Sequence, residues 1–545
     1  MRVCDYIAKY FKKINIDKVF GFQGGAITPL IDSIALEGIK YYQACHEQAA
    51  GFMADSVSRI EGRLSVAMAT NGPGVTNLIT SIANAYLDNA PVLFITGQVA
   101  TADIKTDNIR QNGFQEVDTV KIAQSVTKYA ALVKNTNDVL YELQKAVYIT
   151  KEGRCGAVLL DFPLDILMSE IDIEKQREFI PDIKIKNDFK IDETLELLKK
   201  SKRPVALIGG GVRQAGAIKE VNEFISKTSI PTVSTLMGKD TVFGNSAGFS
   251  GLYGLTGANL AIYNSDLLIV FGSRLSKRQF GKNIENYAPS AKIIQIDTDK
   301  SECNHVVKSD IFINCDIKEF LSNLNKNNLP VCPTEWIEKI KEYKEKYKND
   351  IYVNHDNDPI KIIEKISSIA LNNAIITTDV GQNQMWCAQG WKIKKGQRFL
   401  TSGGLGCMGF SLPAAIGASI VSNAQIIAFT GDGGFQMNLQ ELQTIKTYDL
   451  NVKIVIFNNN SLGMIQENQY KYLNSRYIGT KEGYYCPDIK KIAFAYDINY
   501  YNENKITDFL ADNEASILEI KLKQEPTRLL IKYDKKNVYD EEKIF

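Results

Sequence analysis

Short apolar runs, each followed by a segment long enough for a helix, recur along almost the whole chain. They include "LSVAMATNGPG", "APVLFITGQ", "PVALIGGG", "AQIIAFTGDG" and "VKIVIFNNN", and most of them end at Gly, Asp, Asn or Thr. This β-α-β-α alternation predicts parallel sheets buried between helices on both faces. Ligands bind such sheets beyond the carboxyl ends of the strands. The residues that follow each run are therefore the first candidates for function.

With 545 residues the chain is too long for one hydrophobic core, so several domains are expected. Two charged, Lys-, Glu- and Asn-rich stretches interrupt the alternation and are interpreted as linkers or linker helices. They divide the chain into three α/β blocks, each expected to be a doubly wound parallel sheet. The predicted domains are 1–167, 190–325 and 358–525, with linkers at 168–189 and 326–357 and a C-terminal tail at 526–545.

Composition excludes several classes of function. The formal net charge is +1, which gives no electrostatic reason to bind nucleic acid or an anionic membrane. The longest apolar runs are strand-sized, and the N-terminus lacks the apolar block of a signal peptide, so a soluble cytoplasmic protein is expected. Nine cysteines without a CxxC pair and only three histidines argue against a disulfide framework, a zinc ribbon or a multi-histidine metal centre.

The segment "GDGGFQMNLQELQTIKTYDLNVKIVIFNNN" joins an acidic turn to a pair of asparagines. Asp432 follows one predicted strand, and Asn458 and Asn459 end the next, with one helix between them. Because neighbouring parallel strands end side by side, the carboxylate and the amides should meet. Such oxygen ligands suit Mg²⁺, and the flanking glycines let backbone amides approach phosphate oxygens closely. A plain tight turn is the alternative for an isolated Gly-Asp-Gly.

This combination resembles the diphosphate and magnesium motif of the thiamine diphosphate-dependent enzymes. The resemblance implies that Asp432, Asn459 and the carbonyl of Ser461 ligate Mg²⁺. It also implies a pyrimidine-binding first domain, a central FAD-type domain and a diphosphate-binding last domain.

Family chemistry also needs a glutamate that acts on the cofactor's aminopyrimidine. Glu47, in "HEQAAGFMADSVSR" after a short predicted strand, is the candidate, and simple helix capping is the alternative. In this family the glutamate of one subunit faces the diphosphate site of the other. A homodimer or homotetramer with intersubunit active sites is therefore implied.

The whole chain is most similar to the acetohydroxyacid synthase (acetolactate synthase) group. The similarity rests on "FGFQGGAITPLIDSI", "TNGPGVTNLITSIANAYLDNAPVLFITGQV", "GFQEVD", "GGLGCMGFSLPAAIGA" and "NNNSLGM". It implies catalytic roles for Gly25, Phe114 and Gln115 besides Glu47. It also implies that thiamine diphosphate is held by Val380, Gly381, Gln382, Asn383, Gly406, Met408, Asp432, Gly433, Gly434, Asn459, Ser461, Leu462, Gly463 and Met464. Core packing is the alternative role for Met408 and Phe114.

The middle block carries the flavin pattern of the same group, with an empty vestigial site as the alternative. The resemblance implies FAD, without a redox role in the main reaction. The residues implied are Arg154, Gly209, Gly210, Gly211, Thr235, Leu236, Met237, Gly272, Arg274, Arg278, Asp297, Thr298 and Asp316. Arginines for a pyrophosphate and carboxylates for ribose or amide groups are physically sensible choices.

Several positions depart from the group's pattern, among them Asn383 for histidine and Cys45 for arginine. Asn468 stands where the synthases carry a tryptophan that shapes the substrate pocket together with Met464. Loss of the indole would open room for a different acceptor.

The resemblance predicts decarboxylation of a 2-oxoacid, with pyruvate as the leading donor, and transfer of the aldehyde unit to an acceptor carbonyl. A second 2-oxoacid is the leading acceptor. A keto-sugar nucleotide, simple decarboxylation and a non-catalytic cofactor-binding protein are the alternatives. A small regulatory subunit is a further possible partner.

Overall fold

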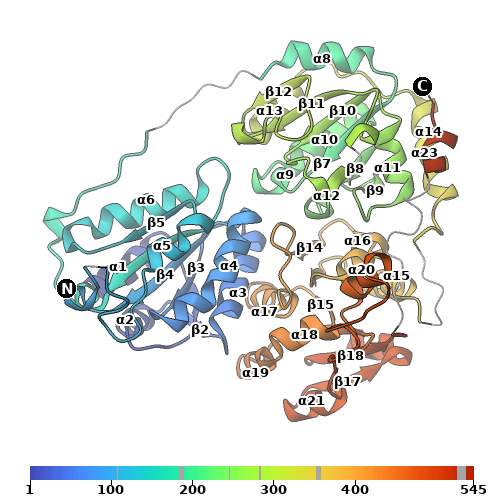
Figure 1. Cartoon of the computed structure of the whole chain (residues 1–545). Coiled ribbons are helices and arrows are strands. Elements are labelled where there is room, and N and C mark those ends of the chain that lie inside the picture. The colour runs from blue at the N-terminus through green and yellow to red at the C-terminus, as the bar shows by residue number, and fades with distance from the viewer. Residues whose placement is uncertain are drawn as a thin grey trace.

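The computed structural model of the chain describes residues 1–106, 108–182, 189–244, 246–280, 284–351, 357–524 and 536–544. Within these ranges the strands form three six-stranded sheets, and every pair of named strands runs parallel. The predicted fold class, three doubly wound parallel-sheet domains, is confirmed. Figure 1 shows the three sheets as separate bodies, with the N-terminal one in blue, the central one in green and the C-terminal one in orange and red.

The N-terminal sheet has the order β2-β1-β3-β4-β6-β5. Its strands are β1 (Lys18–Gly21), β2 (Lys40–Gln43), β3 (Ser65–Ala69), β4 (Val92–Gln98), β5 (Tyr129–Leu132) and β6 (Val158–Pro163). The main helices around it are α1 (Val3–Lys13), α2 (Thr28–Leu36), α3 (Glu47–Glu61), α4 (Pro73–Leu87) and α6 (Val139–Lys151).

The central sheet has the order β12-β11-β10-β7-β8-β9. Its strands are β7 (Pro204–Ile208), β8 (Thr232–Ser234), β9 (Ser246–Phe249), β10 (Leu267–Phe271), β11 (Lys292–Asp297) and β12 (Ile311–Asn314). Helices α8 (Ile191–Lys200), α9 (Gly211–Gln214), α10 (Ile218–Thr228), α11 (Thr256–Tyr263), α12 (Lys277–Phe280) and α13 (Ile317–Leu324) accompany it.

The C-terminal sheet has the order β14-β13-β15-β16-β18-β17. Its strands are β13 (Ile375–Thr378), β14 (Arg398–Thr401), β15 (Ile426–Gly431), β16 (Val452–Asn458), β17 (Asn499–Asn502) and β18 (Ser516–Lys521). Its helices include α15 (Pro359–Ile369), α16 (Gln382–Gly390), α17 (Ser411–Val421), α18 (Asp432–Met437), α19 (Leu442–Thr447), α20 (Gly463–Tyr472), α21 (Ile489–Ala495) and α22 (Ile506–Ala511).

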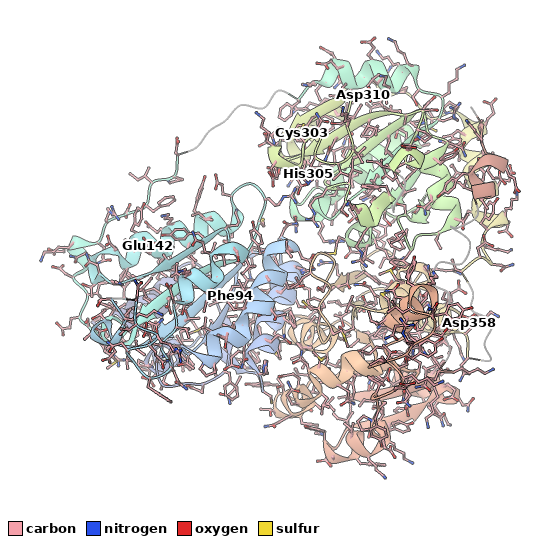
Figure 2. All side chains as sticks on the ribbon, viewed as in Figure 1. Phe94, Glu142, Cys303, His305, Asp310 and Asp358 are labelled. Carbon is pink, nitrogen blue, oxygen red and sulfur yellow. The ribbon has the colours of Figure 1, made fainter. Side chains whose placement is uncertain are left out.

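Helices cover both faces of the N-terminal sheet. Successive side chains of a strand point to opposite faces, and the apolar ones on both faces are buried under these helices. In β4, Phe94 belongs to the core on the α3 and α4 side, whereas Leu93 and Ile95 belong to the core on the α1 and α2 side. Figure 2 shows Phe94 inside the N-terminal domain. The core that contains Phe94 continues through α3 and α17 into the C-terminal domain. The first and last domains of the chain are therefore packed directly on each other.

Both linker segments and the tail were predicted to lie outside the three domains. The segment 326–357 instead contains α14 (Thr334–Lys346), whose buried Trp336, Ile340 and Tyr343 are part of the central core. The tail contains α23 (Lys536–Glu541), and it too returns to the central domain, where Tyr539 packs on Tyr263 (Figure 1). Residues 183–188, 352–356 and 525–535 of the linkers and tail lie outside the described residues.

No helix in the described ranges is both long enough and apolar enough to cross a membrane.

Candidate active site

Each sheet has a central point at which its direction of winding reverses, and most of the predicted site residues cluster around these three points. The reversals fall between β1 and β3, between β7 and β10, and between β13 and β15. At such a point the loops leave neighbouring strands in opposite directions and open a crevice at the carboxyl ends. The three crevices carry, in chain order, the predicted catalytic, flavin and thiamine residues.

The crevice of the C-terminal sheet holds a cavity of about 310 Å³. All fourteen residues predicted to hold thiamine diphosphate line it, from Val380 after β13 to Met464 at the start of α20. A volume of this size lies within the range of small-molecule sites. Gly431, one of the flanking glycines of the acidic turn, lines the cavity as well. Sequence reasoning missed three further lining residues, which are Trp386, Phe457 and Ile465.

The predicted meeting of the acidic turn with the asparagines occurs. Gly431 of β15 is in register with Phe457 of β16, so Asp432 begins α18 beside the segment after β16. The backbone N–H groups of Gly433 and Ser461 donate to the Asp432 carboxylate. Asn458 points the other way, and its amide donates to Glu519 Oε1 at 2.6 Å. Asn459, rather than Asn458, is therefore the asparagine of this cavity.

Burial raises the pKa of Asp432 to about 6, opposed by hydrogen bonds to the carboxylate. One of them comes from the hydroxyl of Tyr484, which donates to Asp432 Oδ2 at 3.0 Å. No sequence motif marks Tyr484. A buried carboxylate that is costly to ionise in this environment would gain most from a cation beside it.

The cavity fits thiamine diphosphate and Mg²⁺ on two observations. First, Asn383 Oδ1 is buried and has no hydrogen-bond partner, so a ligand in the cavity could donate a hydrogen bond to it. Second, Gly433 lines the cavity, and a Cβ there would lie 2.7 Å from Leu462 Cδ2 and 3.3 Å from Met408 Cε, so only glycine fits in this crowded part of the wall. Among the described residues, no group of three or more His, Cys, Asp or Glu side chains is arranged so that it could hold a metal ion by itself. A metal here would thus depend on neutral oxygens and phosphate as well as on Asp432.

Asp379, which sequence reasoning also missed, holds the loops around this cavity. It ends β13, is fully buried, and accepts hydrogen bonds from the Thr430 hydroxyl at 2.9 Å and from the Phe410 N–H at 3.1 Å. Burial raises the pKa of Asp379 to about 7. A Cβ at Gly434 would lie 2.3 Å from its Oδ2, so only glycine allows this approach.

The crevice of the N-terminal sheet contains Glu47 as the first residue of α3. His46 caps this helix by accepting from the Gln48 N–H, and Asn77 on α4 donates to Glu47 Oε2 at 3.0 Å. The side chain is buried, with 8% of the residue exposed, yet it lies beside Gly74, whose Cβ would be 3.4 Å from Glu47 Oε1. An acid at a helix start with one neutral partner remains available to a ligand.

The other predicted catalytic residues lie around the same crevice. Gln115 has a φ of 62°, and its backbone carbonyl accepts a hydrogen bond from the side-chain amide of Asn71. Asn71 lies two residues before the start of α4. Gly25 lies in the loop after β1, and a Cβ there would meet no atom of this chain within 4 Å. Phe114 is 86% exposed. Neither these residues nor Glu47 line the C-terminal cavity of their own chain. The expected site is thus present as two separate halves.

The crevice of the central sheet holds a second cavity, of about 330 Å³. Twelve of the thirteen predicted flavin residues line it. Gly209 does not, because it packs against the loop after β10: its Cβ would lie 2.0 Å from the Gly272 carbonyl oxygen. Close backbone packing accounts for this glycine, and its contact with a flavin stays a prediction.

Charges in this cavity fit a dinucleotide only in part. Arg274 and Arg278 line the wall, whereas the N–H groups of Gly209 and Gly211 after β7 already donate to the carbonyls of Phe271 and Gly272. Arg154, in contrast, is already paired with Asp297 at 3.0 Å, Asp299 at 3.2 Å and Glu302 at 3.5 Å. Its first role is therefore to neutralise this acidic cluster, and Arg274 and Arg278 are better placed for a pyrophosphate.

Asn468 does not line the thiamine cavity. It is exposed on α20, one helical turn beyond Met464 and Ile465, which do line it. It therefore lies beyond the wall of the cavity, on the exposed side of α20.

Three domain patterns of the thiamine pyrophosphate enzymes match the chain. The N-terminal TPP binding domain matches residues 1–122, the central domain residues 191–324, and the C-terminal TPP binding domain residues 379–529. The acetolactate synthase large subunit of Lactococcus lactis is 36% identical over 537 residues, covering 94% of this chain and 91% of that protein. The probable large subunit of Methanocaldococcus jannaschii is 38% identical, covering 95% and 92%. Isozyme 1 of Escherichia coli is 36% identical, covering 85% and 83%.

Fold and site together define a three-domain α/β enzyme that depends on thiamine diphosphate. The chain belongs to the thiamine pyrophosphate enzyme family and is related to the acetolactate synthase large subunits.

Proposed function

We propose that this enzyme decarboxylates a 2-oxoacid, with pyruvate as the leading donor, and transfers the remaining aldehyde unit to an acceptor carbonyl. The observation that carries the proposal is the convergence of all fourteen predicted thiamine residues on one cavity at the β13/β15 crevice. Identity of 34–38% to several acetolactate synthase large subunits supports the same donor chemistry. The bound cofactor supplies an electron sink for the carbon that loses carbon dioxide.

The chain's own residues supply binding and proton transfer. Asp432 and Asn459, with the Ser461 carbonyl, hold Mg²⁺ and thereby the diphosphate. Gly433 and Met408 form part of the wall beside the cofactor, and a side chain at Gly433 would clash with Leu462. Glu47 exchanges a proton with the cofactor's aminopyrimidine nitrogen. General acid–base catalysis requires these two groups to lie within hydrogen-bond reach of each other.

The active unit is proposed to be a homodimer or a homotetramer, because Glu47 lies outside the cavity of its own chain. The exposed Phe114 and the open space at Gly25 support a site completed by the cavity of a second subunit. FAD is proposed for the central cavity, in a non-redox role. The relatives are named as large subunits, so a smaller partner subunit is proposed for this chain as well.

A larger or more polar acceptor, such as a keto-sugar nucleotide, is the second candidate. The observation that favours it is Asn468, a small, polar and exposed side chain one helical turn beyond the lining residue Met464. Product analysis distinguishes the possibilities. Purified protein is supplied with thiamine diphosphate, Mg²⁺ and FAD, and carbon dioxide release is measured with a panel of 2-oxoacids, with and without added ketones.

Pyruvate alone giving acetolactate supports the first candidate. Turnover that requires an added ketone supports the second, and acetaldehyde as sole product indicates a simple decarboxylase. If no 2-oxoacid releases carbon dioxide in the fully loaded enzyme, the proposal is wrong.

A further inference from the structure

One loop of the C-terminal domain forms a wall of both cavities. Residues 402–410 join β14 to α17. Gly403 and Gly404 line the central cavity, whereas Gly406 and Met408 line the thiamine cavity. Only Leu405 separates the two pairs in the sequence, so a shift of this loop changes the shape of both cavities together.

Helix α16 forms the rest of this shared wall. Met385 faces the central cavity, whereas Asn383 and Trp386 face the thiamine cavity. Gln384 ties the helix to the loop, because its amide donates to the Thr401 hydroxyl at 2.5 Å and to the Ser402 carbonyl at 3.2 Å. Loop and helix therefore act as one unit between the two ligand spaces.

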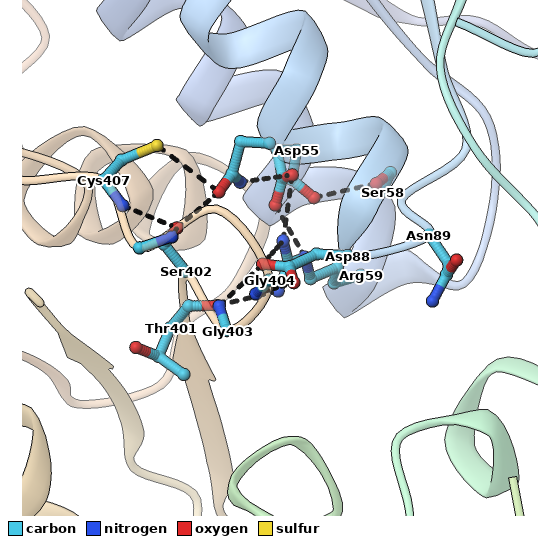
Figure 3. A network of polar contacts seen from close by, with 12 residues as sticks. Asp55, Ser58, Arg59, Asp88, Asn89, Thr401, Ser402, Gly403, Gly404 and Cys407 are labelled. Atoms are coloured by element: carbon cyan, nitrogen blue, oxygen red, sulfur yellow. Dashed lines mark hydrogen bonds and ion pairs between the residues drawn. The ribbon is translucent and has the colours of Figure 1, made fainter. Parts of the chain in front are cut away.

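Asp88, at the end of α4 in the N-terminal domain, holds the first half of the loop. Its carboxylate accepts from the Gly403 N–H at 2.8 Å and from the Gly404 N–H at 2.6 Å (Figure 3). Arg59 donates to Asp88 Oδ2 at 3.2 Å and to the Thr401 carbonyl at 3.0 Å. Asp88 is 4% exposed and also borders the central cavity. These charge-assisted bonds fix the two glycines that face that cavity.

Ser402 holds the second half of the loop. Its hydroxyl oxygen accepts from the Gly406 N–H and the Cys407 N–H, both at 2.9 Å, and the hydroxyl donates to Asn84 Oδ1 at 2.6 Å (Figure 3). Asn84 in turn donates to Asp55, the partner of Arg59. One buried network on α3 and α4 thus sets both halves of the wall.

Arg278 connects the wall to a ligand in the central cavity. It lines that cavity, and its guanidinium donates to the Gly403 carbonyl at 3.1 Å and to Gln384 Oε1 at 3.4 Å. An anionic ligand that binds Arg278 therefore acts on the loop and on α16 at once.

We propose that Asp88 is a positioning residue for the thiamine site, and that the loop it holds makes FAD binding and thiamine diphosphate binding mutually favourable. The inference rests on the proposed flavin site. A ligand against Gly403, Gly404 and Met385 restricts the loop to the arrangement that shapes the thiamine cavity, so the second ligand has less ordering to impose. Binding linkage is reciprocal, and each ligand should tighten the other by the same factor, about 10-fold.

The test measures four dissociation constants on the full-length apoprotein. Thiamine diphosphate with Mg²⁺ is titrated with and without saturating FAD, by the quenching of Trp386, which lines its cavity. FAD is titrated with and without thiamine diphosphate and Mg²⁺, by flavin fluorescence. The expected result in the wild type is an equal tightening of about 10-fold in both directions. Equal constants with and without the other ligand overturn the inference.

Asp88→Asn removes the charge that receives the two glycine amides. The ratio of dissociation constants is expected to fall below about 2-fold, even where the individual constants also rise. A merely structural role would weaken the binding of both ligands and leave the ratio unchanged. That result would overturn the role proposed for Asp88. Asp138→Asn is the matched control, since it makes the same exchange on an exposed N-terminal carboxylate paired with Arg177. It should keep the wild-type ratio.

If Asp88→Asn does not fold, Ser402→Ala serves in its place, because it frees the Gly406 and Cys407 amides without removing a charge. The same loss of ratio is expected. Absence of any FAD binding in the wild type overturns the inference together with the proposed flavin site. Binding of FAD without linkage overturns the inference alone, so the two failures are distinguishable.

Discussion

Asn77 donates a hydrogen bond to Glu47 Oε2 at 3.0 Å, and this is the only side-chain hydrogen bond recorded for Glu47 among the described residues. The pair joins α4 to the first residue of α3 at the β1/β3 crevice. Because Asn77 is neutral, it orients the carboxylate without providing an opposite charge. The position of Glu47 thus serves proton exchange with a ligand better than it serves stability.

Glu47→Gln is therefore expected to abolish catalysis while preserving the fold. The amide can keep the contact with Asn77 but cannot exchange the proton, so carbon dioxide release should fall by about 100-fold or more. The measurement is carbon dioxide release from pyruvate, together with the thermal unfolding temperature. Glu61→Gln, the same change at the other end of α3, should keep wild-type activity. Unchanged turnover in Glu47→Gln would sink the proposed role.

A mixture of two inactive variants tests whether each site needs two subunits. In a hybrid dimer of Glu47→Gln and Asp432→Asn chains, one site carries both lesions and the other carries neither, provided that Glu47 serves the partner's cofactor. Random pairing should then restore about a quarter of wild-type activity. If Glu47 served its own chain, every site would carry one lesion. No recovery in a mixture shown to contain hybrid dimers contradicts the intersubunit site.

Removal of Mg²⁺ should release thiamine diphosphate. Asp432 and Asn459 reach the diphosphate only through the metal in the proposed arrangement, so dialysis against EDTA should free the cofactor, and Mg²⁺ should restore binding. Asp432→Asn should weaken thiamine diphosphate binding by about 10-fold or more, since even outer-shell partners of a metal contribute that much. Asn458→Ala is the control, because Asn458 points toward Glu519. Equal affinity with and without Mg²⁺ would contradict the metal site.

The strand-end motifs made the fold and the thiamine cavity predictable from sequence. Gly431–Gly434 and Asn459 lie at the carboxyl ends of two strands that pair in register, so a local pattern was enough to bring them together. Asp88, Asp379 and Tyr484 were missed for a physical reason. They act through contacts with residues tens to hundreds of positions away, and an isolated Asp or Tyr in a sequence carries no sign of such partners.

The packing of the linkers and the tail was missed for a related reason. The charged pattern of 326–357 was interpreted as a linker or linker helix, and the segment does contain a helix, α14. Its Trp336, Ile340 and Tyr343 form a narrow apolar stripe that is buried on the central domain.

Glu441 should make the apoprotein less stable as the pH rises toward neutrality. It is fully buried and accepts hydrogen bonds from the Cys45 N–H at 3.1 Å and from the Thr444 hydroxyl at 2.6 Å. Cys45 lies two residues before Glu47, the first residue of α3. Burial raises the pKa of Glu441 to about 7 from its ordinary value of 4.5. Between these values the folded chain keeps a proton that the unfolded chain has released, so the stabilisation is complete below pH 4.5 and is lost as the pH rises to about 7.

The full effect is about 3 kcal/mol, because a difference of one in pKa corresponds to about 1.4 kcal/mol. Glu441→Gln cannot titrate, so its unfolding temperature should fall less between pH 5 and pH 7 than that of the wild type. Asp379, whose pKa is also about 7, leaves part of the slope in place. Glu514→Gln, an exposed carboxylate of the same domain, should keep the wild-type slope. Differential scanning calorimetry of the apoprotein across this range measures all three proteins. A slope in Glu441→Gln as steep as in the wild type would show that Glu441 is ionised throughout.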